Sequence, residues 1–109
     1  MQKQISKYLT VLRTLRTIDA EFPLSYFMIL LEVALQEGCS LVDLKNETGM
    51  PMPTLSRIVG ALSDKRQKNA MSYDLLRQEL HKSDPRRKAL YLTAKGKHLV
   101  QKISGIIAQ

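Results

Sequence analysis

The sequence predicts a mainly α-helical domain of about five helices that carries one small, two-stranded β-hairpin. Apolar residues recur at the helical spacing i, i+3, i+4, i+7 in the segments 2–18, 51–62 and 94–108. Between residues 75 and 93, two short apolar runs flank a polar turn, which is typical of a hairpin. A chain of 109 residues, 44% hydrophobic and 25% charged, has the size and composition of one folded domain, so we expect a single domain over 1–109.

The first predicted helix covers residues 2–18, and the second begins near Leu24 or Ser25. Phe22-Pro23 separates them, because proline interrupts a helical pattern. The second helix is apolar around most of its circumference, which predicts the central buried helix, and Gly38 is predicted to follow its C-terminus directly. The apolar stripe of the first helix consists of Ile5, Tyr8, Leu9, Leu12 and Leu15.

The segment 40–62 predicts two helices joined by a tight turn. Ser40 can cap a short helix over 41–48, and Gly49 followed by Pro51 ends that helix. The next helix begins near residues 51–53, because proline is tolerated in a first helical turn. Its predicted core face is Leu55, Ile58, Val59 and Leu62, and its opposite face carries Thr54, Ser56 and Arg57.

Residues 65–74 are polar and weakly patterned, and they predict a loop or a frayed extension of the preceding helix. Two strands follow, at 75–80 and 89–93, around the run 81–88. In this run the turn-forming pair Asp84-Pro85 precedes the cations Arg86, Arg87 and Lys88, so we expect a hairpin with a basic tip. Thr93 is the predicted cap of a last helix over 94–108.

Positive charge is concentrated in the second half of the chain. The net charge is +7, with 17 Lys and Arg against 10 Asp and Glu. Residues 1–50 hold five basic and six acidic side chains, whereas residues 51–109 hold twelve basic and four acidic ones, a net charge of +8. This asymmetry is typical of a protein that binds a polyanion, and nucleic acid is the polyanion we expect.

Two helices joined by a glycine turn and followed by a basic hairpin form the element order of a winged helix-turn-helix. In that arrangement the second helix of the pair enters the major groove, where short polar and basic side chains reach the base edges. The hairpin, or wing, is thin and positive enough to reach the minor groove. The sequence therefore predicts a domain that binds double-stranded DNA.

Two motifs resemble the MarR-type transcriptional regulators, over roughly residues 25–100. The run Thr54-Leu55-Ser56-Arg57, with Ile58, Val59 and Leu62 after it, is similar to the recognition helix of that family. The wing of that family has the signature Asp-x-Arg, followed by an apolar strand and then by Leu-Thr-x-x-Gly at the start of a helix. The matching residues here are Asp84-Pro85-Arg86 and Leu90-Tyr91-Leu92-Thr93-Ala94-Lys95-Gly96, so the chain resembles a short variant of the family.

The resemblance implies a homodimer that binds an inverted repeat, usually as a repressor. It implies that Arg86 enters the minor groove, that Asp84 orients Arg86 or supports the tip, and that Ser56 and Arg57 face the major groove. The chain departs from the family at Pro51–Pro53, which replace the usual polar cap, so Met52 is predicted to contact a thymine methyl group. The connection between recognition helix and wing is about eight residues longer than is usual in the family, at 66–73. These residues are expected either to lengthen the recognition helix or to contact the DNA backbone through Arg66 and Lys68. The predicted DNA-binding residues are Met52, Thr54, Ser56, Arg57, Arg66, Lys68, Lys82, Asp84, Arg86, Arg87 and Lys88.

Apolar faces near both ends of the chain predict a partner helix, most simply that of a second copy. In a lone chain, the isoleucines of the last helix would have little to cover them. The predicted dimerisation elements are therefore residues 2–18 and 94–108, with the contact residues Ile5, Tyr8, Leu9, Leu12, Leu15, Leu99, Ile103, Ile106 and Ile107.

No catalytic or metal-binding motif stands out in the sequence. His81 and His98 have no ligand partners at metal spacing, and no glycine-rich phosphate loop, catalytic triad order or HExxH motif occurs. We therefore predict neither an enzyme nor a metal or other cofactor. The single cysteine, Cys39, is predicted to be a partly buried structural residue rather than a redox sensor, and it suits a reducing cytoplasm. We also predict no signal peptide and no membrane span.

Two alternatives keep the fold and change the function. Winged helices also serve in replication initiation and in plasmid or phage maintenance, and some are protein-interaction modules without DNA binding. The basic second half and the intact hairpin tip argue against a pure interaction module. The sequence holds no motif that identifies the operator or a small-molecule effector.

Overall fold

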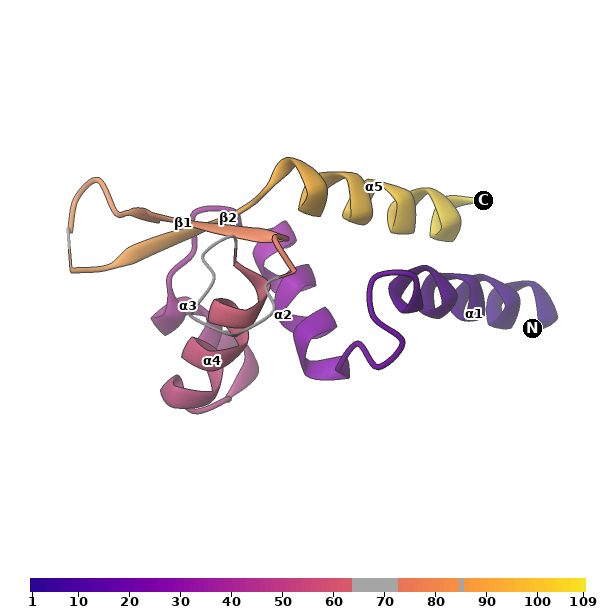
Figure 1. Ribbon diagram of the computed structural model, residues 1–109, viewed down its shortest axis with the longest axis horizontal. Coiled ribbons are helices and arrows are strands. Elements are labelled where there is room, and N and C mark those ends of the chain that lie inside the picture. Colours follow the sequence, from indigo (N-terminus) through magenta and orange to yellow (C-terminus); the bar gives the residue numbers. More distant parts are fainter. Residues whose placement is uncertain (64–72, 85) are drawn as a thin grey trace.

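The computed structural model describes residues 1–63, 73–84 and 86–109, and the elements in them follow the predicted order (Figure 1). These residues form five helices and one two-stranded antiparallel sheet, which confirms the predicted fold class. The predicted loop 65–74 lies outside the described residues except for Tyr73 and Asp74. In chain order the elements are α1 (Gln2–Arg16), α2 (Leu24–Leu35), α3 (Leu41–Thr48), α4 (Met52–Leu62), β1 (Leu76–Leu80), β2 (Lys88–Leu92) and α5 (Ala94–Ala108).

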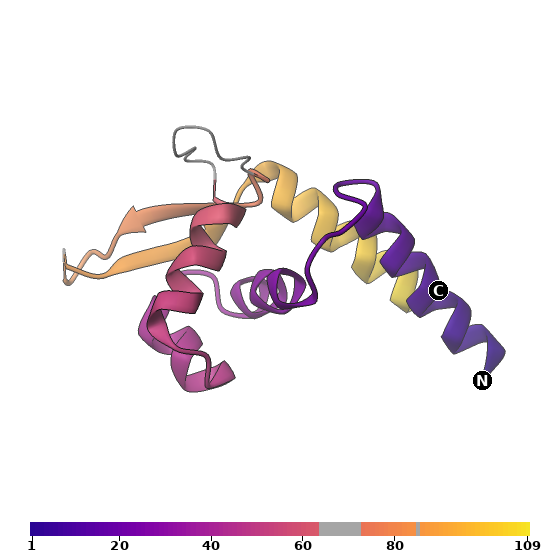
Figure 2. The same cartoon turned by 60° about the horizontal axis from the view of Figure 1, so that its bottom comes forward.

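The helices divide into two groups in space. Figures 1 and 2 show α1 and α5 running side by side in opposite directions and projecting from the rest of the chain; we call this pair the arm. We call α2, α3, α4 and the hairpin the lobe. Both ends of the chain lie at the far end of the arm, and the tip of the hairpin lies at the opposite end of the molecule. Within the arm, Lys7 Nζ donates a hydrogen bond of 3.3 Å to the carbonyl oxygen of Ile107.

The end of α2 differs from the prediction. The helix stops at Leu35 with Gln36 as its C-cap, so Gly38 is not the residue directly after the cap. Gly38 has φ 94°, a left-handed conformation that favours glycine, and its N–H donates to the carbonyl oxygen of Leu90 at 2.7 Å. The N–H of Leu90 donates in turn to the carbonyl oxygen of Cys39 at 2.8 Å. This pairing was not predicted, because a bridge of one residue has no period that a sequence can show.

The turn between α3 and α4 forms as predicted. Ser40 caps α3: its Oγ accepts the N–H of Asp43 at 3.2 Å, and the Asp43 carboxylate accepts the N–H of Ser40 at 2.9 Å. Such a reciprocal pair satisfies two of the N–H groups that a helix start leaves free. Gly49 ends α3 with φ 74°, and α4 begins after Pro51. Local signals, the cap at Ser40 and the left-handed Gly49, therefore set the start and the end of α3.

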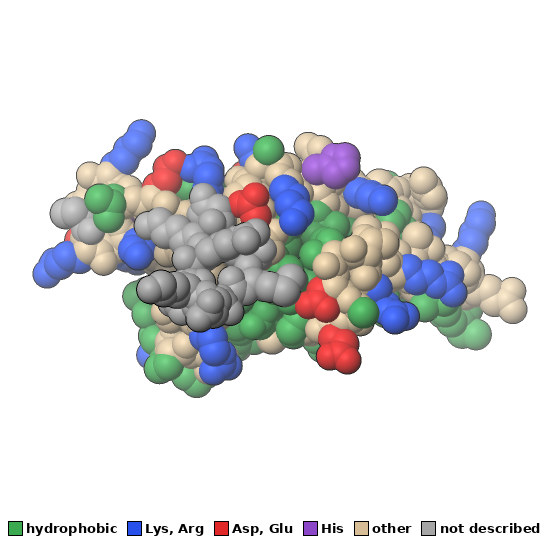
Figure 3. Space-filling view, viewed as in Figure 1, with side chains coloured by type: hydrophobic (Ala, Val, Ile, Leu, Met, Phe, Trp, Pro, Cys, Tyr) green, Lys and Arg blue, Asp and Glu red, His purple; other side chains and the backbone are tan. Residues whose placement is uncertain are grey.

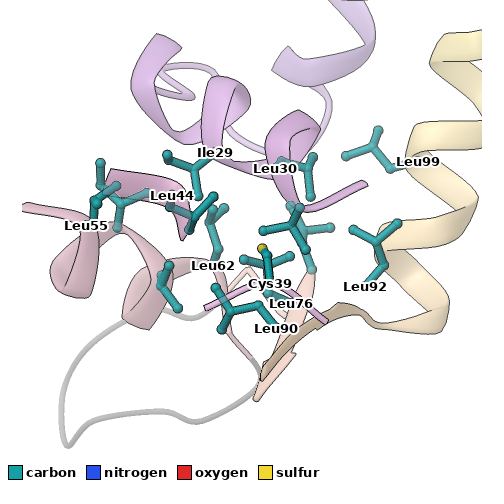
Figure 4. Close-up of a cluster of buried hydrophobic side chains, with 14 of the residues drawn as sticks. Ile29, Leu30, Cys39, Leu44, Leu55, Leu62, Leu76, Leu90, Leu92 and Leu99 are labelled. Carbon is teal, nitrogen blue, oxygen red and sulfur yellow. The ribbon is translucent and has the colours of Figure 1, made fainter. Parts of the chain in front are cut away.

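The core lies where α2, α4 and the hairpin meet (Figure 4). Ile29 and Leu30 of α2, Leu76 of β1 and Leu90 of β2 are fully buried, and Leu99 of α5 covers one side. The predicted core face of α4 is confirmed, since Leu55, Ile58, Val59 and Leu62 are each at most 2% exposed. Burying a leucine or isoleucine contributes about 1.5–3 kcal/mol, so this face holds α4 firmly and turns its other side outward.

The start of α5 is bonded to the segment before the hairpin. Thr93 caps α5 as predicted, because its Oγ1 accepts the N–H of Gly96 at 3.0 Å. The same hydroxyl donates to the carbonyl oxygen of Asp74 at 2.7 Å. A side-chain carbon at Gly96 would collide with the carbonyl oxygen of Leu75, so only glycine lets the two segments approach this closely. The direction in which α5 leaves the lobe is set at this contact.

Candidate nucleic-acid interface

The outward face of α4 presents the side chains that the sequence analysis selected. Ser56 and Arg57 are exposed, while Met52 and Thr54 are half-buried. Ser56 and Arg57 lie away from the buried leucine and isoleucine face of the helix, whereas Met52 and Thr54 flank that face. The wing tip and α4 both lie in the half of the molecule away from the chain ends (Figures 1 and 2). The helix and the hairpin therefore offer two separate contact elements at one end of the protein.

At the tip of the hairpin, Asp84 holds Arg86. The Arg86 backbone N–H donates to Asp84 Oδ1 at 3.1 Å, and its Nε lies 3.4 Å from the same oxygen. The Arg86 side chain is nevertheless 90% exposed, whereas that of Asp84 is 33% exposed. The carboxylate thus fixes the base of the guanidinium while its outer nitrogens face solvent. Lys82 and Lys88 are exposed on either side of this pair.

Arg87 is exposed like its neighbours Arg86 and Lys88, but its guanidinium also has a partner outside the hairpin. Its Nη2 donates a hydrogen bond of 2.9 Å to Oγ of Ser40, the cap of α3. The hydrogen bond from the Ser40 backbone lowers the pKa of the Asp43 carboxyl, and the nearby charge of Arg87 lowers that pKa further. Sequence analysis missed Ser40 as a wing contact, because 47 residues separate the two side chains and no pattern joins them.

The wing also carries an exposed apolar residue that the sequence analysis treated only as part of a strand. Leu80 ends β1 opposite Lys88 and is 67% exposed. Strand alternation places it on the same face as Gln78, whose Nε2 donates to Oγ of Ser63 just after α4. Leu80 therefore adds an apolar side chain beside the basic tip. The opposite face carries Arg77 over the ring of Tyr91, at 4.6 Å from the ring centre.

Charges of both signs are visible on the molecular surface. Figure 3 shows Lys and Arg side chains on the wing at the left and along the arm at the right, with Asp and Glu side chains between them. Two residues predicted to contact the DNA backbone, Arg66 and Lys68, lie outside the described residues. The remaining predicted contacts lie on α4 and the wing, and they are Met52, Thr54, Ser56, Arg57, Lys82, Asp84, Arg86, Arg87 and Lys88.

The structure divides the predicted dimerisation residues into two groups. Leu15, Leu99 and Ile103 are at most 6% exposed within the single chain, so its own core uses them; the expectation that Ile103 lacks cover is wrong. Ile106 is half-buried. This correction follows from the antiparallel packing of α1 on α5, which covers one face of each helix. The other predicted contacts are 42–64% exposed, and they are Ile5, Tyr8, Leu9, Leu12 and Ile107.

Cys39 is buried, and burial raises the pKa of its thiol to about 11, with the negative charge of Asp43 as a second cause. A thiol with so high a pKa holds little of the reactive thiolate near neutral pH. In the described parts of the chain, no three His, Cys, Asp or Glu side chains come together to hold a metal ion. Among the helices described, none is long and apolar enough to cross a bilayer.

Comparison with known proteins places this fold. No family model matches the sequence, and no curated protein matches it. Solved structures do match, and three of them are described here. A cysteine-to-serine mutant of MarR from E. coli has a TM-score of 0.70 at 17% identity, covering 99% of this chain and 72% of its own. A MarR transcriptional regulator from Methanosarcina mazei Go1 has a TM-score of 0.70 at 17% identity, covering 92% of this chain and 65% of its own.

The third match is the transcriptional repressor CouR bound to a 23-mer DNA duplex, with a TM-score of 0.69 at 18% identity. The match covers 99% of this chain and 69% of CouR. These neighbours are transcriptional regulators, not enzymes. At this level of identity the likeness concerns the fold, and it confirms that the chain has the winged-helix architecture of MarR structures.

Proposed function

We propose that this chain, which shares its winged-helix fold with those regulators, is a double-stranded DNA-binding transcriptional regulator. The proposal rests chiefly on Arg86, which is held by Asp84 yet 90% exposed at the tip of the hairpin. Ser56 and Arg57 of α4 are exposed at the same end of the molecule. A helix in the major groove and a thin basic hairpin in the adjacent minor groove suit that arrangement. The DNA-bound state of the neighbour CouR supports it.

We assign the affinity for DNA and the sequence specificity to different side chains. Lys82 and Lys88 are exposed cations on the wing, and contacts from such residues to phosphate supply affinity that falls steeply with salt. Thr54, Ser56 and Arg57, with Met52 at the helix start, would read base edges in the major groove. Arg86 would favour the narrow minor groove of A·T-rich sequence. A regulator works where its DNA lies, so we place this one in the cytoplasm.

We further propose a homodimer formed through the arm, which binds an inverted repeat as a repressor. The support is the exposed apolar stripe of α1, where Ile5, Tyr8, Leu9 and Leu12 are 42–64% exposed although helix α1 packs on α5 with its other face. One domain reads a short site, and two related by a twofold axis read a palindrome.

Sedimentation of purified variants tests the dimer. Leu9→Asp with Leu12→Asp should convert the protein into a monomer, because a partner helix would have to bury two carboxylates. Leu35→Asp is the control, since Leu35 is 80% exposed on the lobe and should leave the mass unchanged. A wild-type protein that sediments as a monomer at micromolar concentration would reject the homodimer.

The DNA-binding proposal is tested by capture of a random duplex library on the purified protein at about 150 mM salt, followed by sequencing. An enriched inverted repeat, with half-sites about one helical turn apart, supports a dimeric sequence-specific regulator. Retention without enrichment would favour a maintenance or architectural role. Loss of binding at every salt concentration would reject DNA binding and favour a protein-interaction module.

A charge-matched pair of variants shows whether the proposed surface is responsible. Arg57→Ala with Arg86→Ala removes two cations from α4 and the wing, and it should abolish enrichment. Lys3→Ala with Lys102→Ala removes two exposed cations from the arm and should leave enrichment intact. Equal losses in both double variants would mean that only net charge matters, and the proposed interface would be wrong.

A further inference from the structure

Arg87 is bonded to the rest of the lobe through both its backbone and its side chain. Its carbonyl oxygen accepts the N–H of His81 at 2.8 Å, and its N–H donates to the carbonyl oxygen of Asp84 at 3.0 Å. Its guanidinium extends to Ser40 Oγ at 2.9 Å. In the described parts of the chain, by contrast, the side-chain partner of the neighbouring Arg86 is Asp84, in the same turn. Two adjacent arginines at one tip therefore have different surroundings.

The acceptor is a buried group with a fixed position. Ser40 is 3% exposed, and its hydroxyl already accepts the Asp43 N–H that starts α3. A serine oxygen has two lone pairs, so it can accept from Asp43 and Arg87 together. The Asp43 carboxylate lies close enough that the charge of Arg87 lowers its pKa. A cation thus meets a serine hydroxyl and an acidic side chain at the first turn of α3.

This bond gives the hairpin a second attachment to the segment 38–40. Nearer the base of β2, the backbone pairing of Leu90 with Gly38 and Cys39 forms the first attachment. Arg87 lies three residues nearer the tip and contacts Ser40, the next residue along the segment. On the other strand, Gln78 is bonded to Ser63, so the bond of Arg87 to Ser40 is the attachment of β2 that lies nearest the tip among those described here.

We propose that Arg87 is a positioning residue, which anchors the wing to the cap of α3 through Ser40 and orients the tip before any ligand arrives. Arg86 is the residue left free for contact. The anchoring itself needs no DNA, and its consequence for DNA affinity rests on the proposed function. A wing fixed in advance loses less conformational entropy when it binds.

Amide hydrogen exchange on the free protein tests the anchor directly. In Arg87→Ala the amides of His81 and Leu90 should exchange at least about fivefold faster, because loss of one hydrogen bond to the wing favours local opening. The amide of Leu30, in the core of α2, reports global unfolding, and its exchange should accelerate by no more than that of the wing amides. Arg86→Ala is the matched control, and its wing amides should exchange as in the wild type. Unchanged exchange in Arg87→Ala would overturn the proposal, whether or not the protein binds DNA.

A double-mutant cycle assigns the effect to Ser40. Ser40→Ala removes the acceptor and also weakens the cap of α3, so its own effect on exchange has two causes. Adding Arg87→Ala to Ser40→Ala should then cause no further acceleration of the His81 amide. Additive effects of the two substitutions would show that Arg87 acts elsewhere, and they would overturn the assignment.

The salt dependence of binding separates positioning from contact in a protein that binds duplex DNA. Arg87→Ala should weaken binding about three- to tenfold while the slope of log K against log salt stays as in the wild type. Lys82→Ala, which removes a cation assigned to phosphate, should reduce that slope by about 0.9, the value for one lost phosphate contact with B-DNA. A similar reduction in Arg87→Ala would show that Arg87 contacts phosphate, and positioning would be wrong. If the wild type binds no DNA, the proposed function is wrong. The exchange experiment alone then tests whether Arg87 anchors the wing to Ser40.

Discussion

The hydroxyl of Tyr73 donates a hydrogen bond of 2.5 Å to the carboxylate of Asp19, which lies 54 residues earlier in the chain. Asp19 belongs to the connection between α1 and α2, and Tyr73 leads into the hairpin. The Tyr73 ring also packs on Phe22 and Tyr26, with ring centres 5.1 and 5.9 Å apart. Lys95 Nζ, at the start of α5, donates to the carbonyl oxygen of Tyr73 at 2.9 Å. Tyr73 therefore contacts both the α1–α2 connection and the start of α5 at the junction between arm and lobe.

The Tyr73 hydroxyl should make stability sensitive to alkali. Burial, with the nearby charge of Asp19, raises the pKa of Tyr73 to about 12, whereas an exposed tyrosine has a pKa of about 10. As the pH rises from 10 towards 12, the unfolded chain loses this proton and the folded chain keeps it, so the free energy of unfolding falls. Urea unfolding at pH 8 and pH 11 should show a smaller loss in Tyr73→Phe than in the wild type. Tyr8→Phe, at an exposed position, should lose as much as the wild type. Equal losses in all three proteins would contradict the prediction.

Replacing each of two glycines of α5 by alanine should change the stability of the protein in opposite directions. Gly96→Ala forces a side-chain carbon onto the backbone of Leu75, and we expect a loss of about 2–3 kcal/mol, in the range of overpacked cores. Gly105 faces open space in the same helix, and Gly105→Ala should raise stability by about 0.5–1 kcal/mol through higher helix propensity. Thermal or urea unfolding at one protein concentration measures both changes. A neutral Gly96→Ala would mean that α5 does not approach Leu75 this closely.

The Cys39 thiol should be unreactive in the native protein. Its pKa of about 11 and its burial beside β2 deprive a reagent of both thiolate and access. At pH 8 we expect labelling by a thiol-specific reagent to be roughly 100-fold slower than in the urea-unfolded chain, which exposes an ordinary thiol. Rapid labelling of the native protein would revive the interpretation of Cys39 as a redox sensor.

Arg57 should determine one base of the proposed site. It is exposed on α4, and if it reads a guanine, Arg57→Ala costs about 1–3 kcal/mol of binding free energy and relaxes preference at that position alone. Binding to the enriched duplex and to single-base variants of it measures both effects. A loss of equal size on every sequence would identify Arg57 as a phosphate contact.

Arg86 should determine preference for the flanks of the site. A guanidinium that enters the minor groove gains most where A·T pairs narrow that groove, so Arg86→Ala should weaken binding most on A·T-rich flanks. Matched duplexes with A·T-rich and G·C-rich flanks, titrated with wild type and variant, measure the difference. An unchanged ratio between the two duplexes would remove Arg86 from the minor groove.

The sequence by itself determined the order and type of the elements, because each one carries a local signal. Ser40 and Thr93 supply caps, Gly49 supplies a left-handed turn, and the apolar spacing of α4 selects its buried face. The Asp84–Arg86 contact was also predictable, since its partners lie two residues apart in one turn.

Only the tertiary structure decided which distant side chains meet. Ser40 meets Arg87, Asp19 meets Tyr73, and Cys39 pairs with Leu90, all across 47 or more residues. The structure also decided which apolar residues of the arm are covered, because helical spacing shows a stripe but not which part of it a neighbouring helix reaches. Periodicity and caps act over one or two turns of chain, whereas these contacts depend on how whole elements pack, and packing leaves no period in a single sequence.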